Sequence, residues 1–144
     1  MGAHIVAYVG QNVSGIARIT ALDPTENGFE THPKIVRLDA DDAVLVEAIH
    51  TAITPAMPGY AGGSNIPVGD VDFYLNGGMI QPGCHPGNIS VQSSADFLKI
   101  PDRIVRNVTG CSHFRAVDVY IEAVTNTSCL FWGRKRGTDI ERYK

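Results

Sequence analysis

Apolar residues occur along the chain in short runs, several of which end at turn-forming pairs. Residues 2–10 (GAHIVAYVG) mix small and apolar side chains, which predicts a short helix whose small side packs closely against a sheet. Residues 16–22 (IARITAL) are rich in β-branched and aliphatic types and end at Asp23-Pro24, which predicts a buried, parallel strand. A helix followed by such a strand is half of an α/β unit.

Two more strands are expected further along. Residues 44–50 (VLVEAIH) suit either a helix or a strand, and we favour a short helical turn over 41–43 that runs into a strand. Residues 71–75 (VDFYL) alternate between apolar and polar types and are closed by Asn76-Gly77-Gly78, a strand and turn signal. The predicted fold class is therefore α/β, with a mostly parallel sheet.

The last predicted element is a helix that begins at Ser112. Its apolar residues recur at helical spacing, at Val117, Tyr120, Ile121 and Val124. This start places His113 in the first turn of the helix.

Composition and charge favour neither nucleic-acid binding nor insertion of the chain into a membrane. The chain has 144 residues with 44% hydrophobic content, enough for a core, and a net charge of -3 that offers no basic face for nucleic acid. No apolar run approaches the length of a transmembrane helix. We therefore expect neither a nucleic-acid partner nor a transmembrane segment.

Cysteines and glycosylation signals favour the secretory route. Asn-x-Ser/Thr triplets, the acceptor sites for glycosylation, occur at Asn12, Asn88, Asn107 and Asn126. Residues 1–15 contain no signal peptide, and the cysteines are odd in number: Cys84, Cys111 and Cys129. We therefore expect a secreted, extracellular protein whose N-terminal part is missing from this chain.

Asp23 and His113 are the candidates for catalysis. Asp23 comes directly after a predicted parallel strand, and ligands of open α/β sheets bind beyond the carboxyl ends of the strands. In the first turn of a helix, His113 would meet the positive end of the helix dipole, which favours a neutral base. An acid followed by a histidine is the chain order of α/β-hydrolases. The alternatives are that Asp23 only forms a turn and that His113 is a surface or capping residue.

Several sequence blocks, in this order, strengthen the catalytic interpretation. They are Gly2-Ala3-His4 with IVAYVG, Ala21-Leu22-Asp23-Pro24, Arg37-Leu38-Asp39 with Asp42-Ala43, Ala48-Ile49-His50-Thr51, residues 71–78, Gln81-Pro82-Gly83-Cys84, and Cys111-Ser112-His113 with Arg115-Ala116. From residue 1 to about residue 134, the chain resembles the neutral (pancreatic-type) lipases and the insect lipases and phospholipases related to them. The resemblance implies a partial α/β-hydrolase fold, with residues 1–144 as the C-terminal portion of a lipase domain.

The resemblance also implies roles for individual residues. Asp23 matches the acid and His113 the base of a catalytic triad, and Cys84 and Cys111 match a disulfide that brackets a lid over residues 85–110. No cofactor is implied for the reaction. A structural calcium ion is implied at a loop whose two carboxylates and two backbone carbonyls suit a hard cation, namely Lys34, Arg37, Asp39 and Asp42. The alternative is that both carboxylates lie at the surface and pair with Arg37.

The expected nucleophile is absent from this chain. In the family it lies in Gly-x-Ser-x-Gly, and Met1-Gly2 would come directly after that serine. None of the serines here has glycine two positions before and two after, and Ser64 matches only on the left. We expect the chain alone to be inactive, either as a fragment of an active lipase or as an inactive lipase-derived lipid-binding or storage protein, like the yolk proteins of flies.

The resemblance implies a carboxylic ester hydrolase that acts in lipid catabolism at a lipid-water interface. In the family, long lids accompany triacylglycerol lipases and short lids accompany phospholipases that cut the first ester. The predicted lid has 26 residues and includes apolar side chains on both sides of Pro101, namely Phe97, Leu98, Ile100, Ile104, Val105 and Val108. This length favours neutral lipid esters, with an sn-1-specific phospholipase as the alternative.

Overall fold

The computed structural model describes residues 1–26, 28–53, 62–84, 102–128, 131 and 133–135, with the backbone alone for 102–109. The helices and strands are α1 (Gly2–Asn12), β1 (Ile19–Leu22), β2 (Val46–His50), β3 (Val71–Tyr74) and α3 (Asp102–Thr125). Short 3-10 turns are η1 (Phe29–Thr31), η2 (Lys34–Val36), η3 (Ala40–Asp42) and η4 (Leu75–Gly78).

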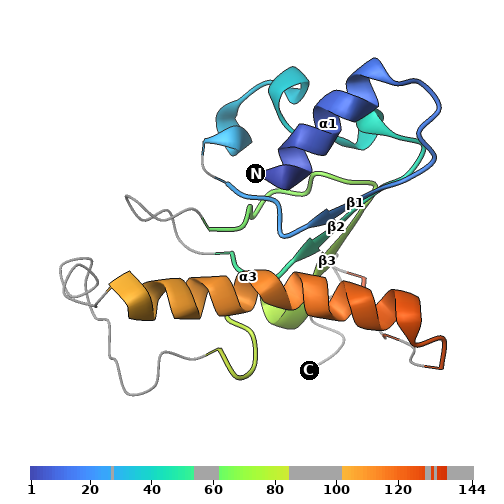
Figure 1. The fold of residues 1–144 in the computed structure, drawn as a ribbon. Helices are drawn as coiled ribbons and strands as arrows, with labels where there is room; N and C mark the ends of the chain where they lie inside the picture. The colour runs from blue at the N-terminus through green and yellow to red at the C-terminus, as the bar shows by residue number, and fades with distance from the viewer. Residues whose placement is uncertain (27, 54–61, 85–101, 129–130, 132, 136–144) are drawn as a thin grey trace.

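The three strands form one parallel sheet in the order β1-β2-β3. Ile19 pairs with Val46 at the start of β1, and His50 pairs with Tyr74 at the end of β3. The sheet lies between α1 on one side and α3 on the other (Figure 1). The predicted α/β class with a parallel sheet is therefore confirmed, and the carboxyl ends of all three strands meet at one edge.

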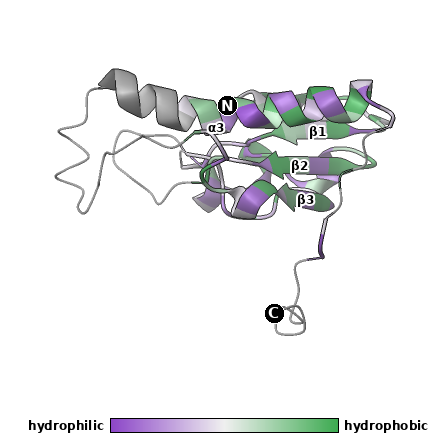
Figure 2. Cartoon of the chain, turned by 90° about the horizontal axis from the view of Figure 1, so that it is seen from below, coloured by the Kyte–Doolittle hydropathy of each residue, from purple (hydrophilic) through white to green (hydrophobic). Residues whose placement is uncertain are grey.

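The core lies between α1 and the sheet. Its buried residues are mostly small or β-branched: Ala7, Ile19, Ala21, Leu38, Val46, Ala48 and Val68. The strands are accordingly hydrophobic along most of their length (Figure 2). A Cβ atom on Gly10 would lie 2.2 Å from the Asp42 carbonyl oxygen, so the small side of α1 permits the close packing that its sequence predicts.

The observed boundaries refine the predicted ones. The first strand begins at Ile19, later than predicted, because residues 16–18 only lead into the sheet. The ambiguous second segment is a strand, and the helical turn expected before it is the 3-10 turn η3. After β3 the chain turns through Asn76 and Gly77, whose φ values of 49° and 79° are in the left-handed region.

The predicted start of the last helix is wrong. Helix α3 begins at Asp102, so His113 lies in the middle of the helix and not in its first turn. The helix dipole acts within the first and last turns and therefore cannot explain a neutral His113. Pro101-Asp102 was the usable start signal, since proline and acidic residues are typical of helix beginnings.

The predicted lid is only partly within the described structure. Residues 102–110 form the first part of α3, while 85–101, and with them Asn88, lie outside the described residues. Cys129 also lies outside them. Of the helices in the described part of the chain, none is long and apolar enough to span a membrane.

Candidate active site

Asp23 is held at the end of β1 in an unusual backbone conformation. Its φ is +45°, in the left-handed region that non-glycine residues rarely adopt, and aspartate is one of the types that tolerate it best. Only 1% of its surface is exposed. Such a conformation costs roughly 1–3 kcal/mol and is typical of functional sites, where the surrounding structure maintains it.

Both carboxylate oxygens of Asp23 accept hydrogen bonds. Oδ1 accepts from the backbone N–H groups of Thr51 at 2.8 Å and Ala52 at 3.0 Å, just beyond the end of β2. Oδ2 lies 2.7 Å from Nδ1 of His113. The carboxylate is thus oriented by the backbone on one side and presented to an imidazole on the other.

His113 has the geometry of a general base. A carboxylate accepts, so Nδ1 carries the proton in the 2.7 Å bond to Asp23, and the Nε2 of the neutral ring keeps a free lone pair. The side chain is 48% exposed, and Nε2 makes no hydrogen bond within the described part of the chain. A proton donor from outside these residues can therefore reach Nε2.

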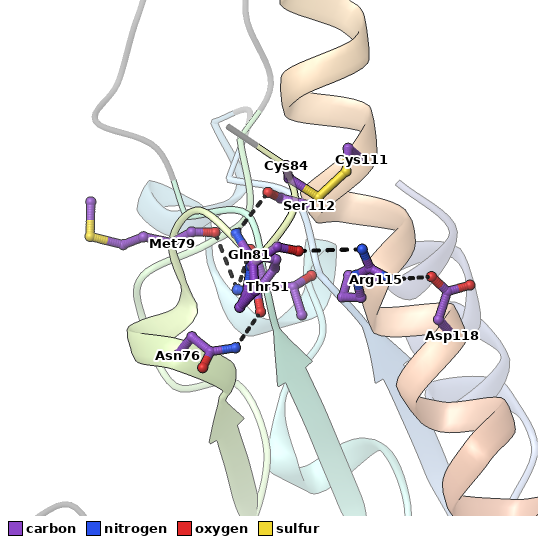
Figure 3. The surroundings of a disulfide bond; sticks show 10 residues. Thr51, Asn76, Met79, Gln81, Cys84, Cys111, Ser112, Arg115 and Asp118 are labelled. Atoms are coloured by element: carbon purple, nitrogen blue, oxygen red, sulfur yellow. Dashed lines mark hydrogen bonds and ion pairs between the residues drawn. A yellow bond between two sulfur atoms is a disulfide. The ribbon is translucent and has the colours of Figure 1, made fainter. Parts of the chain in front are cut away.

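The Gln81–Cys84 turn is connected to α3 by a disulfide and a hydrogen bond (Figure 3). Cys84 and Cys111 form a disulfide with their Cα atoms 5.6 Å apart, as the resemblance predicted. Gln81 N donates to Ser112 Oγ at 3.1 Å, one residue before His113. Since His113 follows these two anchors directly, the turn fixes the part of α3 that carries the base.

Gln81 also connects α3 to the residues behind Asp23. The side chain is fully buried, and its Nε2 donates to the carbonyl oxygens of Thr51 and Leu75, both at 2.9 Å. Its Oε1 accepts from Asn76 Nδ2 at 2.9 Å (Figure 3). Thr51 in turn donates its N–H to Asp23. Sequence reasoning used Gln81 only as part of a motif and missed this connection.

The four residues predicted to bind calcium lie together in one loop. Lys34 Nζ donates to Asp39 Oδ1 at 2.6 Å, Arg37 Nη1 lies 3.4 Å from Asp39 Oδ2, and Asp42 Oδ2 accepts from Asp39 N at 2.8 Å. Burial raises the pKa of Asp39, but hydrogen bonds from Lys34 and the Asp41 N–H outweigh burial and leave the pKa below its ordinary value of 3.8. The Asp39 carboxylate is therefore already neutralised by the protein's own cations.

As arranged, this loop does not fit calcium. Carboxylates and carbonyls are suitable donors, but the Lys34 ammonium bonds the Asp39 oxygen that a cation would need. The Lys34 carbonyl oxygen already accepts from the Arg37 N–H at 3.2 Å and from Gln11 at 3.3 Å. Within the described residues no group of three or more His, Cys, Asp or Glu side chains could hold a metal ion. Calcium binding here would require Lys34 to leave Asp39.

Comparisons with known proteins identify the relatives of this chain. The sequence pattern of the family described as "Lipase" matches residues 1–136. The chain is 37% identical over 126 residues to the human inactive pancreatic lipase-related protein 1. It is 38% identical over 127 residues to the pancreatic triacylglycerol lipase of Cavia porcellus, and 38% over 128 residues to the pancreatic lipase-related protein 2 of Myocastor coypus.

Each of these matches covers 88% of this chain but only 26 to 27% of the relative. The chain thus spans about a quarter of the length of the curated relatives it matches. Both active and inactive proteins are among these relatives, so the comparisons fix the family and not the activity. On the family match and these identities, the chain belongs to the lipase family, in its pancreatic-type branch.

Proposed function

We propose that this chain supplies the acid, Asp23, and the base, His113, of a serine hydrolase that cleaves lipid esters. The observation that carries the proposal is the 2.7 Å bond between Asp23 Oδ2 and His113 Nδ1, across 90 positions of sequence. The bond leaves Nε2 exposed and free to accept a proton. This division of roles is what acyl transfer by a Ser-His-Asp triad requires.

In the complete enzyme, a serine Oγ would attack the ester carbonyl carbon while His113 Nε2 takes the serine proton. The same proton then passes to the leaving alcohol, and water hydrolyses the acyl-enzyme with His113 again as base. Asp23 keeps the Nδ1 proton in place and offsets the positive charge of the ring. His113 thus ends each cycle neutral, as it began.

We propose that the serine comes from outside the described residues. Ser64 is unsuitable, because its hydroxyl donates to Glu30 at 2.7 Å and is not aimed at His113. Burial lowers the pKa of the Met1 amine from its ordinary value of 8.0, and the nearby negative charge of Asp23 opposes this shift. A residue joined to that amine would therefore lie on the same side of the molecule as Asp23, as the proposed upstream serine requires.

For the substrate class we propose neutral lipid esters, in particular triacylglycerols, at a lipid-water interface. Two considerations support this class. One relative reported above is named a triacylglycerol lipase, and the 26 residues between Cys84 and Cys111 match the long lids that the resemblance associates with such lipases. We propose a secreted protein that is active in lipid catabolism, in keeping with its disulfide and its glycosylation triplets.

The test is hydrolysis by the complete protein that contains an upstream Gly-x-Ser-x-Gly. We expect release of fatty acid from a triacylglycerol emulsion and a fall in kcat of about a thousandfold or more for His113→Ala, because the general base is lost. The exposed His32 provides the matched control, and His32→Ala should leave kcat unchanged. Full activity of His113→Ala would contradict the proposal, and preference for phospholipid vesicles would identify a phospholipase instead.

The second candidate is an inactive lipase-derived protein that binds or stores lipid. It is supported by the human relative, which is named inactive and is 37% identical to this chain. The same assay separates the candidates: the second candidate binds the emulsion without releasing fatty acid, and His113→Ala then changes nothing.

A further inference from the structure

Gly63 packs directly against the carboxylate of Asp23. A Cβ atom added to Gly63 would lie 2.5 Å from Asp23 Oδ1, 3.0 Å from Cγ and 3.1 Å from Oδ2, and these are its three nearest atoms. A separation of 2.5 Å is shorter than any that Cβ atoms adopt in practice. As long as Asp23 keeps its place, position 63 accepts only a hydrogen atom.

The carboxylate has little freedom to turn away from an added side chain. It is 1% exposed and accepts three hydrogen bonds, from the N–H groups of Thr51 and Ala52 and from His113. Any rotation breaks the bonds to the backbone, the bond to the imidazole, or both. A side chain at position 63 would therefore act first on the bond that orients the base.

The backbone at Gly63 has even less freedom to retreat than the carboxylate has to turn. Gly63 N donates to the Ala52 carbonyl at 2.9 Å, and Ser64 N donates to the Pro24 carbonyl at 2.7 Å. The Ser64 carbonyl accepts from Nδ1 of the fully buried His50 at 2.9 Å. These bonds tie the segment to the ends of both β1 and β2, so the flexible partner in the clash is the Asp23 side chain.

From these contacts we infer that Gly63 is a positioning residue for the Asp23–His113 pair. Because Gly63 has no side chain, the Asp23 carboxylate can occupy the space beside it. The carboxylate in this position keeps the proton on Nδ1 of His113. The catalytic meaning of this inference rests on the proposed function. Its geometry is open to test without any turnover.

The first test is the tautomer of His113 in the 144-residue chain labelled with ¹⁵N-histidine. The imidazole ¹⁵N shifts of the neutral ring should show the proton on Nδ1 in the unaltered chain. Gly63→Ala should move it toward Nε2, and so should Asp23→Ala, which removes the carboxylate. Gly10→Ala is the matched control. Its Cβ would lie 2.2 Å from the Asp42 carbonyl oxygen, so it introduces a comparable clash at a place that does not touch Asp23 or His113. It should leave the tautomer unchanged.

The second test is a double-mutant cycle on stability. Overpacking by Gly63→Ala should raise the unfolding equilibrium constant about ten- to a hundredfold in the unaltered chain. In the Asp23→Ala background the clashing atoms are gone, and the increase should be about threefold or less. If Gly63→Ala alone does not fold, the cycle still decides, because the double variant should recover folding.

Two results would overturn the inference. One is a His113 tautomer that Gly63→Ala leaves on Nδ1, and the other is a loss of stability that is equally large with and without the Asp23 carboxylate. Failure of the proposed function would look different. In that case the complete protein would hydrolyse no ester, while the tautomer and the cycle would respond as described.

Discussion

Asp23 combines a strained backbone with a carboxylate whose hydrogen-bond partners, Thr51, Ala52 and His113, all lie far from it in sequence. Its φ of +45° aims the carboxylate back across the ends of the strands, where the amides of Thr51 and Ala52 receive it. His4 shows the contrasting case of a buried ring with a structural role. Its Nε2 donates to the Thr25 carbonyl at 2.9 Å, and its Nδ1 accepts from the Leu38 N–H at 3.1 Å.

His4 should make stability depend on pH. Burial lowers the pKa of His4 below its ordinary value of 6.5, and the bond to Thr25 only partly opposes this. The unfolded chain therefore binds a proton that the folded chain rejects, so the contribution of His4 is complete above about pH 6.5 and is lost as the pH falls toward the lower folded pKa. We expect urea unfolding at pH 7.5, 6.5 and 5.5 to show this loss.

The variant His4→Gln is the control for this prediction. It removes the titrating group and should flatten the pH dependence over the same range. The carboxyl of Asp39 does not interfere, because its lowered pKa confines its effect to acid below about pH 3.8. Equal pH slopes for the two proteins would contradict the role given to His4.

The position of His113 depends on how α3 is attached to the sheet. The disulfide and the Gln81–Ser112 bond connect the helix to the turn after β3, and Gln81 extends this connection to Thr51. These contacts replace the helix dipole as the explanation of how His113 is placed. These contacts determine where His113 lies, and they do so without any contribution from the partial charge at a helix end.

Gln81→Leu should destabilise the chain by about 2–4 kcal/mol, because it leaves the Thr51 and Leu75 carbonyls buried without a donor. Denaturant unfolding is the measurement. Gln11→Leu is the control, since Gln11 is exposed and makes one long bond of 3.3 Å, and it should change stability by less than about 0.5 kcal/mol. Equal losses of stability in the two variants would contradict the stabilising role given to the Gln81 hydrogen bonds.

The loop of Lys34 and Asp39 makes a prediction about calcium. Because the Lys34 ammonium bonds Asp39, a cation must displace it before binding. Lys34→Ala should therefore bind calcium more tightly than the unaltered chain, as measured by calorimetry or by the rise in melting temperature with calcium. Absence of any calcium response in both proteins would show that the loop is a purely structural ion-pair site.

Across the molecule as folded, the elements that the sequence predicts best are those whose local pattern matches their place in the fold. Apolar runs predicted the parallel strands, and the order of acid and histidine, together with the resemblance, selected Asp23 and His113 from many polar residues. The apolar spacing after Ser112 does not reveal the start of α3, because the helix already begins at Asp102.

Other features could not be predicted because they depend on contacts between distant segments. Gly63 meets Asp23 only because residues 62–64 return to the ends of β1 and β2. The doublet Gly62-Gly63 was the available signal, since glycine often marks a close approach of backbone. Gln81 carried no such signal, because a buried glutamine is recognised only when its partners are known.

We propose that Asp23 orients His113 as the base of an ester hydrolase, and the variant Asp23→Asn in the complete protein tests this role. An amide of the same size keeps the packing but no longer favours the Nδ1 proton on His113, so kcat on a soluble short-chain ester should fall about a thousandfold or more. Asp118→Asn, at an exposed position on α3, should leave kcat unchanged. A folded Asp23→Asn protein whose kcat stays within about tenfold of the unaltered enzyme would contradict the account.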